Sequence, residues 1–160
     1  MFKGLCLSLC FSLSCASAWA GTFSTDYCEF SVTFPADYST REMIYGQSGG
    51  IAAVANATRD TRIAAECWPY TDQSPINIYA KAMQAEMEQR GFAINSVSID
   101  RNNKLAPQIV ISGRLEAGGE TYYTTTISIM GKSSRLDLSI VERHLASKAH
   151  MTFRESVRWK

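Results

Sequence analysis

Alternating apolar and polar residues predict β-strands along much of the chain. In residues 28–34 every second residue, beginning with Cys28, is apolar, and Pro35 ends the run. This period of two is typical of a strand with one buried face. Similar runs occupy residues 41–45, 51–58 and 62–68. The last two of these runs are close enough in sequence to form a hairpin that turns at Arg59-Asp60.

Apolar residues spaced three and four positions apart predict one long helix at residues 75–90. Ser74 is placed to cap the N-terminus, and Pro75 suits the first helical position. Gly91 is expected to end the helix in a left-handed conformation. The apolar stripe of this helix should face the core. It consists of Ile76, Tyr79, Ala80, Met83 and Met87.

After this helix the pattern returns to β structure. Residues 92–100 predict a strand whose apolar phase slips at Asn95-Ser96, which indicates a bulge. Three more strands, separated by turns at residues 118–119 and 131–134, predict an antiparallel meander with one buried face. Its inward residues are expected to be Ile109, Ile111, Leu115, Tyr123, Thr125, Ile127, Ile129, Leu136, Leu138 and Ile140.

A final amphipathic stretch predicts a closing helix at residues 146–159, with Ala146, Ala149, Phe153 and Val157 inward. The complete pattern predicts an α+β fold, in which an antiparallel sheet packs with one long central helix and a C-terminal helix. No repeat or linker interrupts the pattern, so residues 21–160 are expected to form a single domain.

The first twenty residues have the features of a secretory signal peptide. Lys3 supplies a positive charge, an apolar stretch follows at residues 4–14, and Ala18-Trp19-Ala20 fits a cleavage site. The apolar stretch is shorter than the ~20 residues that a membrane-spanning helix needs. We therefore expect residues 1–20 to be removed. The mature protein should be periplasmic or secreted, without a transmembrane segment.

The charge of the chain limits the classes of partner that it can bind, and its cysteine content indicates the compartment in which it folds. Loss of Lys3 with the signal peptide leaves 15 basic and 15 acidic residues, scattered along the sequence. This balance argues against a nucleic-acid partner, which requires clustered positive charge. Only Cys28 and Cys67 lie beyond residue 20, and they are expected to form a disulfide in an oxidising compartment. Two free thiols are the alternative, but neither lies near a histidine in sequence.

One sequence pattern raises the possibility of catalysis. Residues 46–50 read Gly-Gln-Ser-Gly-Gly, and similar patterns surround serine nucleophiles in hydrolases. Those nucleophiles lie between a strand and a helix, whereas a β-type pattern follows Ser48. A small secreted serine hydrolase that uses Ser48 with His144 or His150 is the alternative function. The two histidines lack the cysteine or carboxylate spacing of a metal site, so we predict neither a metal nor a cofactor.

Several aromatic residues are predicted at strand ends or on outward positions. Rings on a surface are common in binding sites, because they bury a large area with little loss of conformational freedom. Trp68, Tyr70 and Tyr122 are therefore the candidate partner-binding residues, with Tyr45 in a similar position. Ordinary packing of these rings on a sheet is the alternative.

The order of elements resembles the PsbP-like fold. The likeness lies in the opening strand Phe-Ser-Val-Thr-Phe-Pro at residues 30–35, the hairpin, the helix that begins at Ser74-Pro75, the meander and the short terminal helix. DcrB-type bacterial envelope proteins and a Ran-binding nuclear-import factor share this fold, as do some exported immunity proteins of type VI secretion systems. The family has no common catalytic motif. The resemblance implies a non-enzymatic protein that binds another protein in the bacterial envelope, and toxin neutralisation is the most specific form of this hypothesis.

We predict that the mature protein begins at Gly21 and carries no lipid. The intact mass of protein purified from the periplasm should equal that of residues 21–160. The alternative is a lipid anchor on Cys15, although the preceding leucine is one position too close for the usual lipobox. A diacylglyceryl mass on Cys15 would contradict the prediction.

Overall fold

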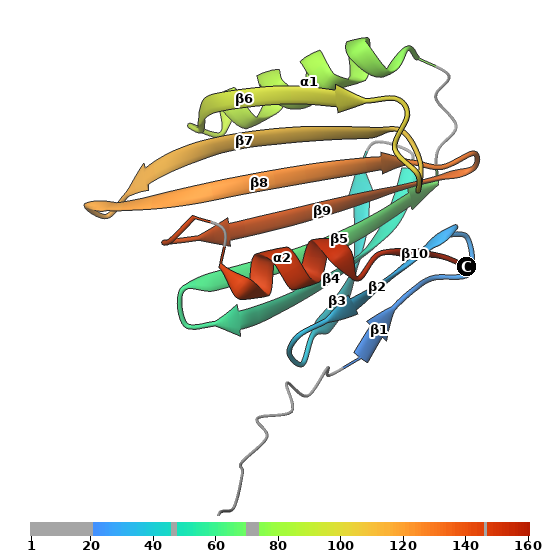
Figure 1. The fold of residues 1–160 in the computed structure, drawn as a ribbon, viewed down its shortest axis with the longest axis horizontal. Helices are drawn as coiled ribbons and strands as arrows, with labels where there is room; N and C mark the ends of the chain where they lie inside the picture. The colour runs from blue at the N-terminus through green and yellow to red at the C-terminus, as the bar shows by residue number, and fades with distance from the viewer. Residues whose placement is uncertain (1–20, 46–47, 70–73, 146) are drawn as a thin grey trace, which may run out of the picture.

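Seven antiparallel strands form one large sheet in the computed structural model, which describes residues 21–160 except 46–47, 70–73 and 146 (Figure 1). In spatial order they are β3 (Ser39–Tyr45), β4 (Ser48–Thr58), β5 (Thr61–Pro69), β9 (Ser134–Glu142), β8 (Glu120–Met130), β7 (Gln108–Ala117) and β6 (Ala93–Asp100). A second sheet contains β1 (Gly21–Phe23), β2 (Phe30–Phe34) and β10 (Arg158–Trp159), with β2 in the middle. The helices are α1 (Ile76–Gln89) and α2 (Lys148–Glu155).

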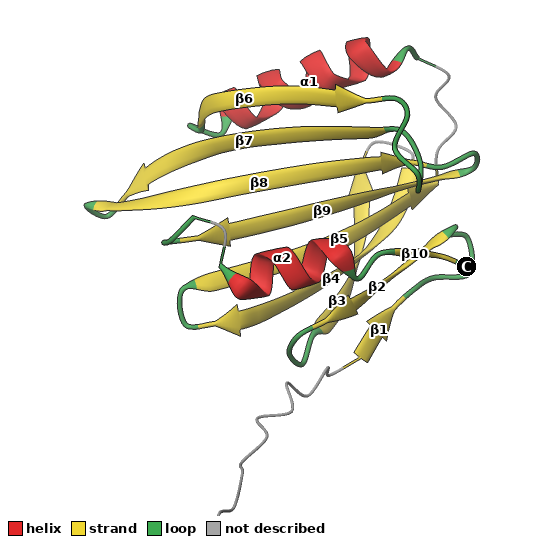
Figure 2. Ribbon diagram, viewed as in Figure 1, coloured by secondary structure: helices red, strands yellow, loops and turns green. Residues whose placement is uncertain are grey.

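This architecture confirms the predicted α+β fold, with one long helix and one C-terminal helix beside an antiparallel sheet (Figure 2). The bulge predicted in the strand after α1 is present, because the pairing of β6 with β7 shifts between Ile94 and Ser96. The predicted signal peptide and Tyr70 lie outside the described residues. Neither described helix combines the length and the apolar composition that crossing a membrane requires.

Helix α1 begins one residue later than expected. Pro75 occupies the N-cap position, and its carbonyl oxygen accepts the first two helical hydrogen bonds, so the assignment of Ser74 as the cap was wrong. The C-terminus follows the prediction, since Gly91 has φ of 89°. There the Phe92 N–H donates to the Met87 carbonyl at 3.1 Å. The Arg90 N–H donates to the same carbonyl at 3.1 Å, so this oxygen in the last helical turn is paired twice.

The closing helix is shorter than predicted, because the last residues join the small sheet. The Ser156 hydroxyl donates to the Thr33 carbonyl and accepts from the Thr33 N–H, both at 3.0 Å. After Ser156 the chain is extended, and Trp159 pairs with Phe30 on β2. These contacts give the backbone of the last residues hydrogen-bond partners on β2, which it would lose if the helix continued. Of the four residues predicted inward, Phe153 and Val157 are buried, Ala149 is half-buried, and Ala146 lies outside the described residues.

The predicted single buried face holds along β9 but not along β7, because the assignment of Ile109 and Ile111 to that face was wrong. Ile109 pairs with Ser128, and Val110 pairs with Ile127. Neighbouring residues of a strand point to opposite faces, so Ile109 and Ile127 belong to different layers. Ile109 and Ile111 pack with α1, whereas Ile127 packs in the core beneath β2 and α2. An apolar run such as residues 109–111 is compatible with either face.

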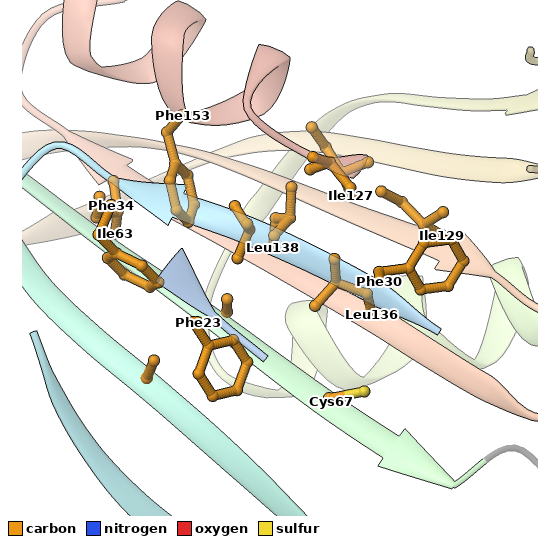
Figure 3. Close-up of a cluster of buried hydrophobic side chains, with 14 of the residues drawn as sticks. Phe23, Phe30, Phe34, Ile63, Cys67, Ile127, Ile129, Leu136, Leu138 and Phe153 are labelled. Carbon is orange, nitrogen blue, oxygen red and sulfur yellow. The ribbon is translucent and has the colours of Figure 1, made fainter. Parts of the chain in front are cut away.

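The larger core is centred on β2, which lies across the large sheet without being part of it (Figure 3). Phe30, Val32 and Phe34 are fully buried. The Phe34 ring packs against that of Phe153 on α2, with centroids 4.9 Å apart. Full burial of such side chains contributes roughly 1.5–3 kcal/mol each. The sheet contributes the other fully buried side chains, among them Ile63, Leu136, Leu138 and Ile140.

Two further interactions attach the beginning of β2 to the large sheet. Cys28 forms a disulfide with Cys67 on β5, with Cα atoms 6.0 Å apart. The Glu29 carboxylate accepts hydrogen bonds from the backbone N–H groups of Ser133 and Ser134 at 2.9 and 3.0 Å. Burial raises the pKa of Glu29, but these hydrogen bonds outweigh it and hold the pKa below its usual value. The disulfide of Cys28 and the hydrogen bonds of Glu29 therefore attach two adjacent residues to the large sheet.

We expect reduction of the disulfide to lower the free energy of unfolding by about 4 kcal/mol, because the bond closes a loop with a sequence separation of 39. Urea unfolding of the oxidised and reduced protein measures this difference. The double variant Cys28→Ala/Cys67→Ala should not respond to reductant. Alkylation of two thiols in unreduced, denatured protein would contradict the pairing.

Candidate functional site

Residues of β8, β9 and β5 that point to the same side as α1 form a surface that we call the polar face. Its rows follow from the strand register. Glu66 pairs with Asp137 and Asp137 with Ser128, and Ser128 pairs with Ile109 beneath α1. The next row has Ala64, Ser139 and Thr126, which are small and half-buried. Helix α1 packs on β6 and β7, and the polar face continues from there across the sheet.

Trp68 and Arg135 lie side by side at one end of the polar face. The Trp68 side chain is only 8% exposed, and its ring covers Gly50, where an added Cβ would lie 2.6 Å from the ring. The Arg135 guanidinium is 5.9 Å from the Trp68 ring centroid and 4.8 Å from that of Tyr79 on α1. The last glycine of the Gly-Gln-Ser-Gly-Gly pattern therefore provides space for a tryptophan ring.

Asp137 forms an ion pair with this arginine, and Glu66 is the cross-strand neighbour of Asp137. The Arg135 Nε donates to Asp137 Oδ2 at 2.9 Å, and the Ser128 hydroxyl donates to the other oxygen of Asp137. Burial raises the pKa of Asp137, although Arg135 and Ser128 oppose the shift. Burial, followed by the charge of Asp137, also raises the pKa of Glu66. Burial therefore disfavours the ionised form of both carboxyls at this end of the polar face. The positive charge of Arg135 partly compensates for the negative charge of Asp137.

Tyr122 lies at the other end of the polar face, beside a hollow of ≈ 210 Å³. The Arg143 guanidinium is 5.7 Å from the Tyr122 ring centroid. It also lies 3.6 Å from an Asp60 carboxylate oxygen and 3.8 Å from one of Glu120. A hydrogen bond with Tyr122, followed by the charge of Glu120, raises the pKa of Arg143. Each end of the polar face therefore combines an aromatic ring with an arginine.

Two of the predicted partner-binding residues, Trp68 and Tyr122, share one face but do not form one cluster. Trp68 pairs with Arg135 at the start of β9, whereas Tyr122 lies next to Tyr123, which pairs with Glu142 at the end of β9. The arginines beside the two rings, Arg135 and Arg143, are eight residues apart, which corresponds to roughly 27 Å along a strand. Tyr70 and the Tyr45 side chain lie outside the described part of the structure.

The structure does not bring either histidine to Ser48. Ser48 begins β4 and pairs with Tyr45 in a hairpin, while its side chain lies outside the described part. His150 is hydrogen-bonded to Glu142, with Nδ1 and Oε1 2.8 Å apart, at the end of the sheet where β4 finishes. The length of β4, roughly 30 Å, therefore separates Ser48 from this pair. His144 is exposed near the same end of the sheet as His150.

The buried pair of His150 and Glu142 was missed by sequence reasoning. The two residues are eight positions apart, across an irregular segment between β9 and α2. Burial raises the pKa of Glu142, but hydrogen bonds from His150 and Ser147 outweigh it and lower the pKa overall. This pair fixes the beginning of α2 on the sheet. Within the described ranges, no group of three His, Cys, Asp or Glu residues is arranged to hold a metal ion.

Comparison with known proteins identifies related folds but no family. No protein-family model matches the chain, and no curated protein matches it. A crystal structure from Bacteroides thetaiotaomicron has a TM-score of 0.53 at 12% sequence identity, covering 89% of this chain and 49% of that one. This likeness concerns the fold alone. The chain spans about half the length of the solved structures that it matches.

Two further solved structures have lower scores. The immunity protein TplEi of the T6SS of Pseudomonas aeruginosa, complexed with a peptide, has a TM-score of 0.48 at 12% identity and covers 88% of this chain and 54% of that one. The Tle4–Tli4 complex has a TM-score of 0.47 at 12% identity and covers 82% and 46%. Scores of this size carry no argument about function, and the PsbP-like resemblance stays a prediction.

We expect Glu66→Gln to stabilise the protein at neutral pH. A carboxyl whose pKa is raised by folding binds its proton more tightly in the folded state. The wild type should therefore lose stability as the pH rises from about 4.5 towards 7, and the variant should lose less, because only the contribution of Asp137 remains. Urea unfolding across this range measures the difference.

The matched control is Glu155→Gln, which removes the same charge from an exposed position on α2. It should leave the pH dependence unchanged. If the wild type is as stable as Glu66→Gln at pH 7, or more stable, the carboxyl is not disfavoured by its surroundings.

Proposed function

We propose that this protein is exported and acts by binding another protein through the polar face, without a catalytic reaction of its own. The observation that carries the proposal is the contact of the half-buried Tyr122 with Arg143 at one end of this face, with Arg135 against the buried Trp68 at the other end. Aromatic and arginine side chains supply much of the binding energy at protein interfaces once water is excluded.

The centre of the polar face suits close approach by a partner. Between the two arginines lie small, half-buried side chains, including Ala64, Thr126 and Ser139. Small side chains let a partner's surface come near the sheet, and the hydroxyl groups of Thr126 and Ser139 can form hydrogen bonds across the contact. Because the two ends are roughly 27 Å apart, a partner that contacts both must present an extended surface.

The structure supports export and binding over hydrolysis. The disulfide between Cys28 and Cys67 is compatible with an oxidising compartment, where such bonds persist. Ser48 and the histidines occupy opposite ends of β4, so the arrangement that a serine hydrolase needs has no support. In its most specific form the proposal is an immunity protein whose partner is a toxin of a type VI secretion system, as the PsbP-like resemblance implies.

We predict that Tyr122→Ala weakens binding of the partner at least about tenfold, the effect expected for loss of an aromatic residue that is buried in the contact. The purified protein is used to capture a partner from envelope and secreted fractions, and affinity for the purified partner is then measured. Tyr70→Ala tests the third candidate. Trp68→Phe is preferable to alanine, because the ring covers Gly50.

Tyr123→Ala is the matched control. Tyr123 is the adjacent, half-buried tyrosine of β8 and points to the opposite side of the sheet. A complex weakened by Tyr123→Ala and not by Tyr122→Ala would move the contact to the other face. Turnover of an ester or peptide substrate that disappears in Ser48→Ala would overturn the non-enzymatic proposal.

A further inference from the structure

Charges that are scattered along the sequence converge at the Tyr122 end of the polar face. The hollow of ≈ 210 Å³ is bounded by the turn between β4 and β5 and by the end of β9. Three of its lining residues are arginines, and Asp60 is the one lining carboxylate. The complete lining is Asn56, Arg59, Asp60, Thr61, Arg62, Tyr122, Val141 and Arg143. We call this site the arginine hollow.

The three arginines differ in how their charge is balanced. Arg143 is held by the Asp60 and Glu120 carboxylates, at 3.6 and 3.8 Å. Its backbone N–H also donates to the Asp60 carbonyl at 3.1 Å, which fixes the turn against the end of β9. Arg59 and Arg62 are exposed and form no ion pair with any described residue. The hollow therefore keeps an excess of positive charge in a protein whose total charge is nearly balanced.

The sheet fixes where Arg62 lies. On β5 it pairs with Asn56 on β4 and with Val141 on β9, so its backbone is held on both sides. A guanidinium presents several N–H donors in a plane and matches the two oxygens of a carboxylate. The Tyr122 hydroxyl and the Asn56 amide add neutral groups that can donate to the same ligand.

The size of the arginine hollow favours a side chain over a small-molecule ligand. Its ≈ 210 Å³ is below the roughly 300–1,000 Å³ that is usual for pockets binding drug-sized molecules or cofactors. Asp60 and Glu120 lie beside Arg143, and their negative charge opposes the approach of a continuous phosphate backbone. A folded protein can present only one or two carboxylates, and these meet less of this repulsion than a continuous phosphate backbone does.

We propose that the arginine hollow binds an acidic side chain of the partner protein. The inference rests on the proposed function and adds the chemistry of the partner, which presents aspartate or glutamate residues at one end of the contact. Surface ion pairs are individually weak, so recognition depends on Arg59, Arg62 and Arg143 acting together. Binding through these groups weakens as salt rises and screens the charges.

A peptide of glutamate residues tests the site without requiring the natural partner. In the ¹H–¹⁵N spectrum of the complete protein at low salt, hexaglutamate should shift the amide signals of Asp60, Thr61 and Arg62. Arg62→Glu should weaken this binding at least about fivefold. Arg62→Gln removes the charge without adding another, and it should also weaken binding. Arg101→Glu is the matched control, because Arg101 is exposed in the turn after β6.

The outcomes separate the alternatives. Peptide binding that Arg62→Glu and Arg62→Gln leave unchanged would overturn the inference. Tighter binding of a single-stranded oligonucleotide than of hexaglutamate, at equal charge, would also overturn it and identify a phosphate-binding site. If Tyr122→Ala weakens the binding of a captured protein partner and Arg62→Glu does not, the inference of an acidic contact is wrong while the proposed function stands.

Discussion

The burial of β2 against the large sheet is the constraint on which the rest of the structure depends. Phe30, Val32 and Phe34 are fully buried, yet β2 forms no ladder with any of the seven strands. Its position is therefore set by side-chain packing and by tethers at its ends. With α2, β2 covers one face of the sheet, and α1 covers part of the opposite face over β6 and β7. The polar face extends beyond α1, opposite the core that β2 and α2 cover.

Core and candidate site are coupled through the alternation of β9. Leu136, Leu138 and Ile140 point into the core beneath β2, and the residues between them point to the polar face. A shift of β9 by one position would turn Asp137 into the apolar core beneath β2 and Leu138 out of it, which costs hydrophobic burial and leaves a carboxyl among apolar side chains. The packing of the core thus fixes the position of Arg135 relative to Trp68.

Features encoded by neighbouring residues could be predicted from the sequence. Helix α1, its end at Gly91 and the hairpins depend on local spacing and on turn residues, and the structure has them close to their predicted positions. Features that depend on pairing between distant segments could not be predicted. Glu66 and Asp137 are 71 positions apart and meet only through the register of β5 with β9. The chain after Ser156 looks helical by composition, but pairing with β2 makes it extended.

The connection between β2 and β10 has a consequence for the order in which the structure can form. The Ser156 hydroxyl meets the backbone of Thr33 across 123 positions, so the small sheet cannot close until nearly all of the chain is available. The disulfide partners are only 39 positions apart. In a chain that is threaded across a membrane from its N-terminus, Cys28 and Cys67 emerge long before β10 does. Oxidation can therefore attach β2 to β5 early and shorten the search that remains for the last residues.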